Sequence, residues 1–548
     1  MAKLHPGATL TPTKLDLITA WMPEQRWYTA KGRRPVLRRV GGFRFEDPAG
    51  QVGMETLLVL DEAATPAVVY QVPLTYRATP LAGAEHALVG ITEHSVLGTR
   101  YVYDAPHDPV YVRALLDLIG AGGTSDLATP IGGGSTEPAT GHPVAADLEL
   151  EVTGSRVLTG EQSNTSIIID AQRRTGPDAG RSHPLIVKLF RVLADGENPD
   201  VILQSALARA GSRLVPDPFG SMTGAWQNPS DRAGTSPGAD PVDEAHGHLA
   251  FASAFLAGTV DAWRVATQGV AADTDFTARA RELGAATAAV HHDLARVLPT
   301  AAADPAARAD QLASWQARAD AAVIAAPELG DHATAIAAIF QAGAQCDWPA
   351  LQRVHGDYHL GQVLDVPGRG WVLLDFEGEP LRPLAERNRP DLPLRDVAGM
   401  LRSFDYAAGN HAVGHPQDRA RAAAWALACR TAFLDGYASA GPDPRADADS
   451  AALLRALELD KALYEVVYEA RNRPTWITVP ASAVHRLCSN TLRPDGSENT
   501  MTETNRPDDP TWAPVEGQLS GGGKAGSATP AAMPRIRPAS WDELGLLV

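Results

Sequence analysis

The chain changes its pattern once, near residue 256, and this change limits the folds that it can adopt. Before that point, short runs of β-branched and aromatic residues alternate with turn residues, which is typical of strands. From about residue 261 onward the chain is Ala-rich and has helical periodicity. The helical part is interrupted at 354–376, where the pattern indicates a strand, a turn and a second strand. The sequence therefore predicts an α+β protein with a β-rich lobe followed by a helical lobe.

Length and composition indicate how the lobes divide. At 548 residues the chain is longer than one typical domain. We expect a β-rich unit over 1–105, a second β-containing unit over 106–257 and a helical lobe over 258–490. The remainder, 491–548, is rich in Gly, Pro, Ser, Thr and Asn and is predicted to be disordered. The expected strands are 54–60, 67–72, 86–89, 155–159, 165–170, 185–190, 219–227 and 248–256, and the expected helices are 14–22, 108–119, 276–298, 305–326, 331–344, 393–408, 417–440 and 446–471.

The charge and the cysteines restrict the partners. A net charge of −17 argues against a nucleic-acid partner, because binding phosphate backbones requires a basic surface. Three cysteines without metal-ligand spacing fit a reducing compartment. The N-terminus lacks the apolar run of a signal peptide, and no stretch reaches the roughly 20 apolar residues that span a bilayer. We therefore expect a cytoplasmic protein that binds neither nucleic acid nor membrane.

The strand-turn-strand segment carries the most informative motif. His355-Gly356-Asp357 is followed five residues later by Gln362, and Asp375 ends an apolar run thirteen residues after that. Phosphoryl transfer needs positioning, charge neutralisation and a partner for the acceptor's proton. Asp357 can accept that proton, while Gln362 and Asp375 offer oxygen ligands to Mg²⁺. This is the protein-kinase spacing with Gln in place of the usual Asn, and it favours a kinase over a hairpin with ordinary turn residues.

The nucleotide side is indicated by a lysine in an apolar strand. Lys188 lies in the predicted strand 185–190, where a kinase places its phosphate-binding lysine. A lysine at a strand edge is the alternative interpretation. The preceding segment has small polar residues that can present N–H and hydroxyl groups to phosphates, and the chain has no Walker motif. These nucleotide-side residues are Ser163, Asn164, Thr165 and Ser166.

Taken together, the motifs give the chain a family resemblance. From about residue 15 to 490 it resembles the actinobacterial maltokinases, which belong to the aminoglycoside-phosphotransferase-like kinases. The matching segments are QRWYTAKGR at 25–33, GEQSNTS at 160–166, GENPD at 196–200, HGDYHLGQ at 355–362, DFEGEP at 375–380 and YEVVYEARNRP at 464–474.

The resemblance implies a two-lobed, protein-kinase-like fold with an N-terminal cap subdomain, an intermediate nucleotide-binding subdomain and a helical C-lobe. It implies ATP- and Mg²⁺-dependent phosphorylation of maltose at its anomeric hydroxyl, which gives maltose 1-phosphate for α-glucan synthesis, with trehalose synthase as a partner. By the same resemblance Asp357 is the base, Gln362 and Asp375 bind the metal, and Lys188 contacts phosphate. The adenine hinge would include Ser253, Phe255 and Leu256, and the sugar contacts would be His359, Glu377, Arg382, Tyr464 and Arg471.

One position departs from the family. The helix after Lys188 is expected to offer a carboxylate partner just after Asp200-Val201, but Ile202 stands there. Either Glu197 substitutes for that carboxylate, or the lysine is held otherwise. Two other functions remain open. An aminosugar kinase, for example for glucosamine, or an aminoglycoside phosphotransferase would need carboxylates such as Glu377 and Glu379. A pseudokinase that serves as a binding subunit of trehalose synthase is the alternative outside enzymes.

Three further groups have two interpretations each. Trp27 and its basic neighbours either bind a ligand or pack the core of the first unit. Tyr464 and Tyr468, one helical turn apart, either stack on a sugar ring or form a buried helix face. For His291 we expect helix capping or packing and not metal binding.

Overall fold

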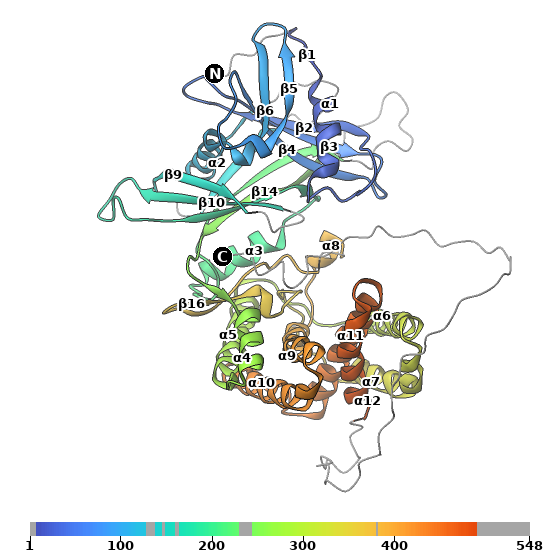
Figure 1. Ribbon diagram of the computed structural model, residues 1–548. Helices are drawn as coiled ribbons and strands as arrows, with labels where there is room; N and C mark the ends of the chain where they lie inside the picture. The colour runs from blue at the N-terminus through green and yellow to red at the C-terminus, as the bar shows by residue number, and fades with distance from the viewer. Residues whose placement is uncertain are drawn as a thin grey trace, which may run out of the picture.

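The computed structural model describes residues 7–127, 137–144, 148–158, 164–228, 244–379 and 382–489. The β-rich part lies at one end of the molecule and the helices gather at the other, as the sequence predicts (Figure 1). The predicted disorder of 491–548 lies outside the described residues.

The first sheet forms the outer end of the molecule. Its strand order is β1-β5-β6-β4-β3-β2-β7, and β12 pairs with β4. Its inner strand β3 is apolar from Leu57 to Leu60 because both faces are covered there: Leu57 and Val59 pack toward helix α1, while Leu58 and Leu60 pack toward α2. The elements are β1 (Leu10–Thr11), α1 (Lys14–Trp21), β2 (Leu37–Phe45), β3 (Gly53–Asp61), β4 (Val68–Arg77), β5 (Leu88–His94), β6 (Gly98–Asp104), α2 (Pro109–Ala121), β7 (Asp126–Leu127) and β12 (Val192–Leu193).

The second sheet follows the first and has the order β8-β13-β14-β11-β10-β9. Its inner face shares one hydrophobic core with α2 and with one face of the first sheet. Helix α3 (Pro199–Arg209) lies between this sheet and the helical lobe (Figure 1). The strands are β8 (Thr140–Pro143), β9 (Leu150–Val157), β10 (Asn164–Arg173), β11 (Leu185–Phe190), β13 (Pro218–Gln227) and β14 (Glu244–Ala254).

The helical lobe surrounds one large core and carries a small three-stranded sheet at its inner edge. Its central contact joins α5 and α10 through two glycines, because a Cβ on Gly284 or Gly436 would lie 1.9 Å from a backbone oxygen of the other helix. The elements are β15 (Val260–Asp261), α4 (Ala262–Ala272), α5 (Thr277–Val297), α6 (Pro305–Ala325), α7 (Ala333–Gln345), β16 (Val363–Val366), β17 (Gly370–Leu373), α8 (Leu384–Arg387), α9 (Leu394–Gly414), α10 (Arg419–Ala440), α11 (Ala448–Asn472) and α12 (Thr478–Ser489).

The sequence missed several elements. Strand β2 was not expected because two glycines and three arginines hide its alternation, and a bulge near Gly41 shifts its register. Strand β6 and helices α4 and α12 were also not expected. The proposed domain boundaries stay predictions, but β7 and β12 join the first sheet although they come after residue 105. Among the described helices, none combines the length and the apolar character needed to cross a membrane.

Candidate active site

The loop that carries Asp357 is fixed by one buried carboxylate, Asp396. Asp396 lies in the first turn of α9 and is 2% exposed. Its oxygens accept the backbone N–H groups of His355 and Gly356 at 2.8 and 2.9 Å, and the Nε2 atom of His291 lies 3.0 Å from one of them. Burial opposes ionisation, but the hydrogen bond from His291 and the nearby imidazoles outweigh it and lower the pKa of Asp396. A loop held at two N–H groups presents Asp357 in a defined orientation.

His291 therefore packs inside the helical lobe, as expected from the sequence, and helps to position Asp396. Its Nδ1 lies 3.0 Å from the hydroxyl of Tyr437 on α10. Through His291 the helical core is tied to the catalytic loop, and no metal-binding role is needed to explain this histidine.

Two left-handed backbone conformations bring the halves of the motif together. Gly356 has φ 84°, and a Cβ there would lie 3.2 Å from the Cα of Gly378. Asp375, two residues after β17, has φ 61°, which costs a residue with a Cβ roughly 1 kcal/mol or more. This turn directs the Asp375 carboxylate toward Gln362, whose Nε2 donates to Oδ2 at 2.9 Å. The structure therefore brings together the two residues predicted as metal ligands.

Lys188 extends from β11 into a group of three carboxylates. Its Nζ lies 2.7 Å from Asp375, 3.0 Å from Asp200 and 3.3 Å from Glu377. Of the two possibilities that the sequence left open, substitution by Glu197 is wrong: Lys188 is held instead by Asp200, Asp375 and Glu377.

The reason lies in the start of α3. Asn198 caps this helix and accepts the N–H of Asp200, which places Asp200 in the first turn with 1% exposure. The side chain of Glu197 precedes the helix and is exposed. The residue at which the helix begins decides which acidic side chain faces Lys188, and a sequence motif does not reveal that residue.

The same acids form an oxygen-rich site. One carboxylate oxygen from each of Asp200, Asp375 and Glu377 lies within 4.8 Å of the others. Oxygen-only donors fit a hard cation such as Mg²⁺. Burial raises the pKa of Glu377 to about 7, and the negative charges of Asp375 and Asp200 add to this effect, while Lys188 opposes it. Asp200 is fixed from two sides: its Oδ1 accepts the N–H of Phe376 at 2.8 Å and Nε2 of Gln204 at 2.5 Å.

Beside the catalytic loop the structure places a residue that the sequence did not single out, Lys461 on α11. Its Nζ lies 3.5 Å from Asp357 and 3.1 Å from Glu379, and 5.2 Å from the centre of the Tyr464 ring. Burial lowers the pKa of Lys461, but the charges of Glu379 and Asp357 outweigh it and raise the pKa well above the usual lysine range. Glu379 responds in the opposite sense: burial raises its pKa, but Lys461 and nearby arginines bring it to about 2. Asp357, the predicted base, thus has a permanent positive charge beside it.

The other predicted sugar contacts differ in their surroundings. Arg382 is 3.0 Å from Glu379 and 3.7 Å from Asp391. The Nδ1 of His359 accepts the N–H of Gly361 at 3.0 Å, and burial lowers the pKa of His359 to about 4, so this imidazole is neutral. Arg471 is exposed and lies ten residues beyond Lys461, roughly 15 Å along the helix. Their roles as sugar contacts stay predictions.

The predicted nucleotide residues also differ in their surroundings. Asn164 donates from Nδ2 to Glu377 at 3.1 Å, which links the start of β10 to the carboxylate group. Thr165 and Ser166 are buried, and the hydroxyl of Thr165 accepts from Arg191. Ser163 lies outside the described residues.

At the predicted hinge, Ser253 is buried in β14. The N–H of Phe255 donates to Pro184, and the oxygen of Leu256 accepts from Thr259. The hinge role stays a prediction.

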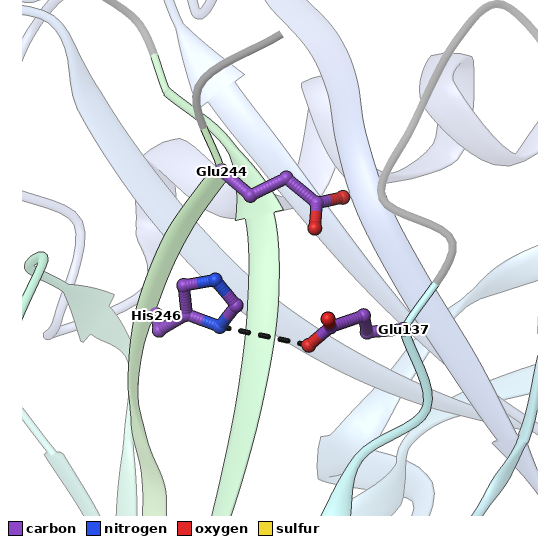
Figure 2. Close-up of side chains that lie close together, drawn as sticks. All are labelled: Glu137, Glu244 and His246. Atoms are coloured by element: carbon purple, nitrogen blue, oxygen red, sulfur yellow. Dashed lines mark ion pairs between the residues drawn. The ribbon is translucent and has the colours of Figure 1, made fainter. Parts of the chain in front are cut away.

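A second set of side chains that could hold a metal lies on β14 and just before β8. Glu137, Glu244 and His246 point toward one another there (Figure 2). His246 and Glu137 form an ion pair at 3.6 Å, and both are more than half exposed, at 57% and 55%. A solvated ion pair explains this group, and we assign it no catalytic role.

Comparisons with known proteins agree with this geometry. The family model of the maltokinase N-terminal cap domain matches residues 21–108. Glucosamine kinase of Streptacidiphilus jiangxiensis is 30% identical over 366 residues, which cover 62% of this chain and 75% of that protein. Glucosamine kinase of Mycolicibacterium smegmatis (strain ATCC 700084 / mc(2)155) is 30% identical over 351 residues, covering 61% and 79%.

Solved structures show the same fold. Crystal form B of a glucosamine kinase has a TM-score of 0.58 at 23% identity and covers 87% of this chain and 100% of that one. A glucosamine kinase in complex with glucosamine, ADP and inorganic phosphate has a TM-score of 0.56 at 25% identity, with 87% and 99% covered. The predicted α+β, kinase-like fold with an N-terminal cap and a helical C-lobe is thereby confirmed.

Proposed function

This chain belongs to the family of maltokinase-like sugar kinases, and we propose that it transfers the γ-phosphoryl group of ATP to the anomeric hydroxyl of maltose. The products are maltose 1-phosphate, a building block for α-glucan, and ADP. On the same resemblance we propose trehalose synthase as the source of maltose and as a partner.

The pairing of Lys461 with Asp357 is the observation that carries the choice of acceptor. The ammonium group lies 3.5 Å from the carboxylate that we assign as the base. A cation beside the acceptor hydroxyl is compatible with a neutral sugar such as maltose. It would repel the ammonium group of an aminosugar that lay within a few ångströms of it, because like charges repel, and the side chains of Lys461 and Asp357 are only 25% and 26% exposed. The match to the maltokinase cap over 21–108 points to the same acceptor.

The chain's own residues account for the transfer. Asp357 accepts the proton of the anomeric hydroxyl as the oxygen–γ-phosphorus bond forms and the bond from the γ-phosphorus to ADP breaks. Lys188 neutralises phosphate charge. Gln362 and Asp375 hold Mg²⁺, with Asp200 and Glu377 close enough to support it. The bound cation would supply neutralisation of the charge on the nucleotide phosphates.

Glucosamine is the second candidate acceptor, because both sequence relatives described above are glucosamine kinases. The acids Glu377 and Glu379 could bind its ammonium group. The third alternative, a pseudokinase, has lost its support. It depended on the lack of a carboxylate partner for Lys188, and Asp200 supplies that partner.

Acceptor turnover tests the proposal. ADP release would be measured with ATP, Mg²⁺ and one of maltose, glucosamine, glucose or an aminoglycoside, and the product ester would be located by phosphorus and proton NMR. We expect the highest kcat/KM with maltose and a phosphate on its anomeric carbon. Turnover of glucosamine without turnover of maltose would contradict the proposal and establish the second candidate.

A further inference from the structure

One fully buried arginine joins the cap to the nucleotide side of the site. Arg191 directly follows β11, three residues after Lys188, and directly precedes β12, which pairs with the cap strand β4. Its side chain is 0% exposed. The chain thus passes through Arg191 on its way from the strand of the phosphate-binding lysine to the cap sheet.

The guanidinium group contacts three separate segments. Its Nη2 donates to both oxygens of Asp104, at 2.8 and 2.6 Å, where β6 of the cap ends. Its Nε donates to the hydroxyl of Thr165 at 2.8 Å, at the start of β10. Its central carbon lies 4.9 Å from the centre of the Trp27 ring, which is buried in the cap core. One rigid side chain therefore fixes Thr165 relative to two cap residues.

Thr165 is the neighbour of Asn164, which reaches the catalytic carboxylates. Asn164 donates to Glu377 at 3.1 Å, and the same Glu377 oxygen lies 3.3 Å from Lys188. A shift of Thr165 moves Asn164 with it, because the two are joined by one peptide unit. The position set by Arg191 is therefore transmitted to the residues around the nucleotide phosphates.

The backbone at this point is held by the cap as well. Gln71 of β4 donates from Nε2 to the oxygens of Phe190 and Leu249, at 2.8 and 2.9 Å, and its N–H donates to the oxygen of Arg191 at 2.8 Å. These bonds tie the C-terminal end of β11 and the middle of β14 to the cap. The backbone of Arg191 is therefore held in place, and its planar guanidinium group can position Thr165.

Stability alone does not explain an arginine here. Removing a guanidinium and a carboxylate from water is costly, and apolar residues of similar volume often stabilise such positions equally well. Within the described part of the chain, Nη1 of Arg191 is buried without a hydrogen-bond partner, which adds a desolvation cost. A group retained at this cost indicates a geometric role.

We propose that Arg191 is a positioning residue through which the cap, by Asp104 and Trp27, sets the start of β10 for nucleotide binding. The proposal rests on the nucleotide-side assignment of Lys188 and Asn164, and it does not depend on which sugar is the acceptor. Cap residues that touch no substrate then influence the affinity for ATP.

A double-mutant cycle tests this coupling in the full chain. Asp104→Asn and Thr165→Val each remove one partner of Arg191, from opposite sides, with little change of shape. Each is expected to lower kcat/KM for ATP and the affinity for ADP, measured by calorimetry, by about tenfold, the loss typical of one charge-assisted hydrogen bond. The double variant is expected to bind ADP no more weakly than the single variant with the lower affinity, because each single substitution already breaks the same relay. KM for the sugar should change less than the affinity for ADP, because the relay reaches the predicted sugar contacts only at its last residue, Glu377.

A second buried pair in the cap provides the control. Arg77 holds Asp108 by two bonds of 2.7 Å, and Asp108 is 0% exposed. This pair joins the end of β4 to the start of α2, and within the described residues it forms no hydrogen bond or ion pair with Lys188, Asn164 or Thr165. Asp108→Asn should lower the melting temperature and leave ADP affinity unchanged. Arg191→Lys should behave like the single variants, since an ammonium group cannot hold both partners at once.

The possible outcomes are distinct. Additive losses in the cycle would mean that Thr165 touches nucleotide directly, and would overturn the relay. Equal losses of ATP and sugar affinity, or an effect of Asp108→Asn on ADP binding, would also overturn it by indicating general destabilisation. If Asp104→Asn does not fold, Thr165→Val combined with Arg191→Lys gives the same test. Unchanged ADP affinity in Lys188→Met would instead refute the nucleotide-side assignment.

Discussion

The Nζ of Lys188 lies 2.7 Å from Oδ1 of Asp375, and so the proposed phosphate-binding lysine and the proposed metal ligand form an ion pair. Two more acids, Asp200 and Glu377, lie 3.0 and 3.3 Å from the same Nζ. The ammonium group therefore lies among the three carboxylates that could bind a cation. A cation bound to these carboxylates would share them with Lys188, and this would link nucleotide binding to metal binding.

Removing Lys188 should weaken nucleotide use more than it weakens folding. Lys188→Met is expected to lower kcat/KM for ATP about 100-fold or more, because phosphate charge is no longer neutralised. Asp200→Asn should produce a smaller loss of the same kind, since Lys188 keeps two other acids. Steady-state kinetics with ATP as the varied substrate measures both. Glu197→Gln is the matched control, and a loss there as large as in Asp200→Asn would contradict the assigned partner.

The base assignment predicts a selective loss of turnover. Asp357→Asn is expected to reduce kcat by about 10²- to 10⁴-fold, with little change in the KM for ATP, because the proton acceptor is lost while the phosphate contacts remain. Single-turnover measurements separate the chemical step from product release. Retention of more than a tenth of the wild-type rate would show that another group takes the proton.

Metal dependence follows from the oxygen-only donor set. Removal of divalent ions with EDTA should abolish turnover, and Mg²⁺ should restore it. Asp375→Asn should raise the Mg²⁺ concentration for half-maximal activity about tenfold or more, since one charged ligand becomes neutral. Binding of Mn²⁺ followed by electron paramagnetic resonance gives a readout that does not require turnover. Full Mn²⁺ affinity in Asp375→Asn would exclude this residue as a ligand.

Lys461 should control the choice between neutral and cationic acceptors. Lys461→Met removes the charge 3.5 Å from Asp357 and is expected to shift the ratio of kcat/KM values toward glucosamine and away from maltose by about tenfold, as like-charge repulsion disappears. The two acceptors would be compared at the same ATP concentration. Lys14→Met, in the cap, controls for loss of a lysine elsewhere. A proportional loss with both sugars would show that Lys461 orients Asp357 without selecting the acceptor.

Mild acid should destabilise the fold through His248. Burial lowers the pKa of His248 to about 4, with a smaller contribution from His142, and its Nδ1 accepts the N–H of Asn198 at the start of α3. The unfolded chain binds this proton near pH 6.5 and the folded chain does not. The stabilisation is therefore present above pH 6.5 and is lost as the pH falls toward 4.

Urea unfolding at pH 7 and pH 5 measures this effect. The free energy of unfolding should fall by about 2 kcal/mol from this residue, and His248→Gln should remove that part of the change. An identical pH dependence in the variant would show that His248 titrates normally.

The parts of the site that the sequence could predict are local. His355 to Gln362 form one loop, and Asp375 ends the adjacent hairpin, so their spacing along the chain determines their distance in space. Asp200 was missed because its direction depends on where α3 begins. Lys461 was missed because it comes from a helix about a hundred residues further on, where one lysine in a helical pattern carries no signal. The contact of Arg191 with Asp104 spans 87 positions and is equally invisible to a motif.

The two residues of β12 have a consequence for how members of this family can be recombined. Because Val192 and Leu193 pair with Tyr70 and Val69, the chain re-enters the cap sheet after it has built the lysine strand. The cap is therefore not a module that ends at one cut in the chain. A chimaera could take residues 1–105 from one relative and the remainder from another. Its strands β4 and β12, which pair in one sheet, would then come from different proteins. It would need 69–71 and 190–193 exchanged together to keep Lys188 in place.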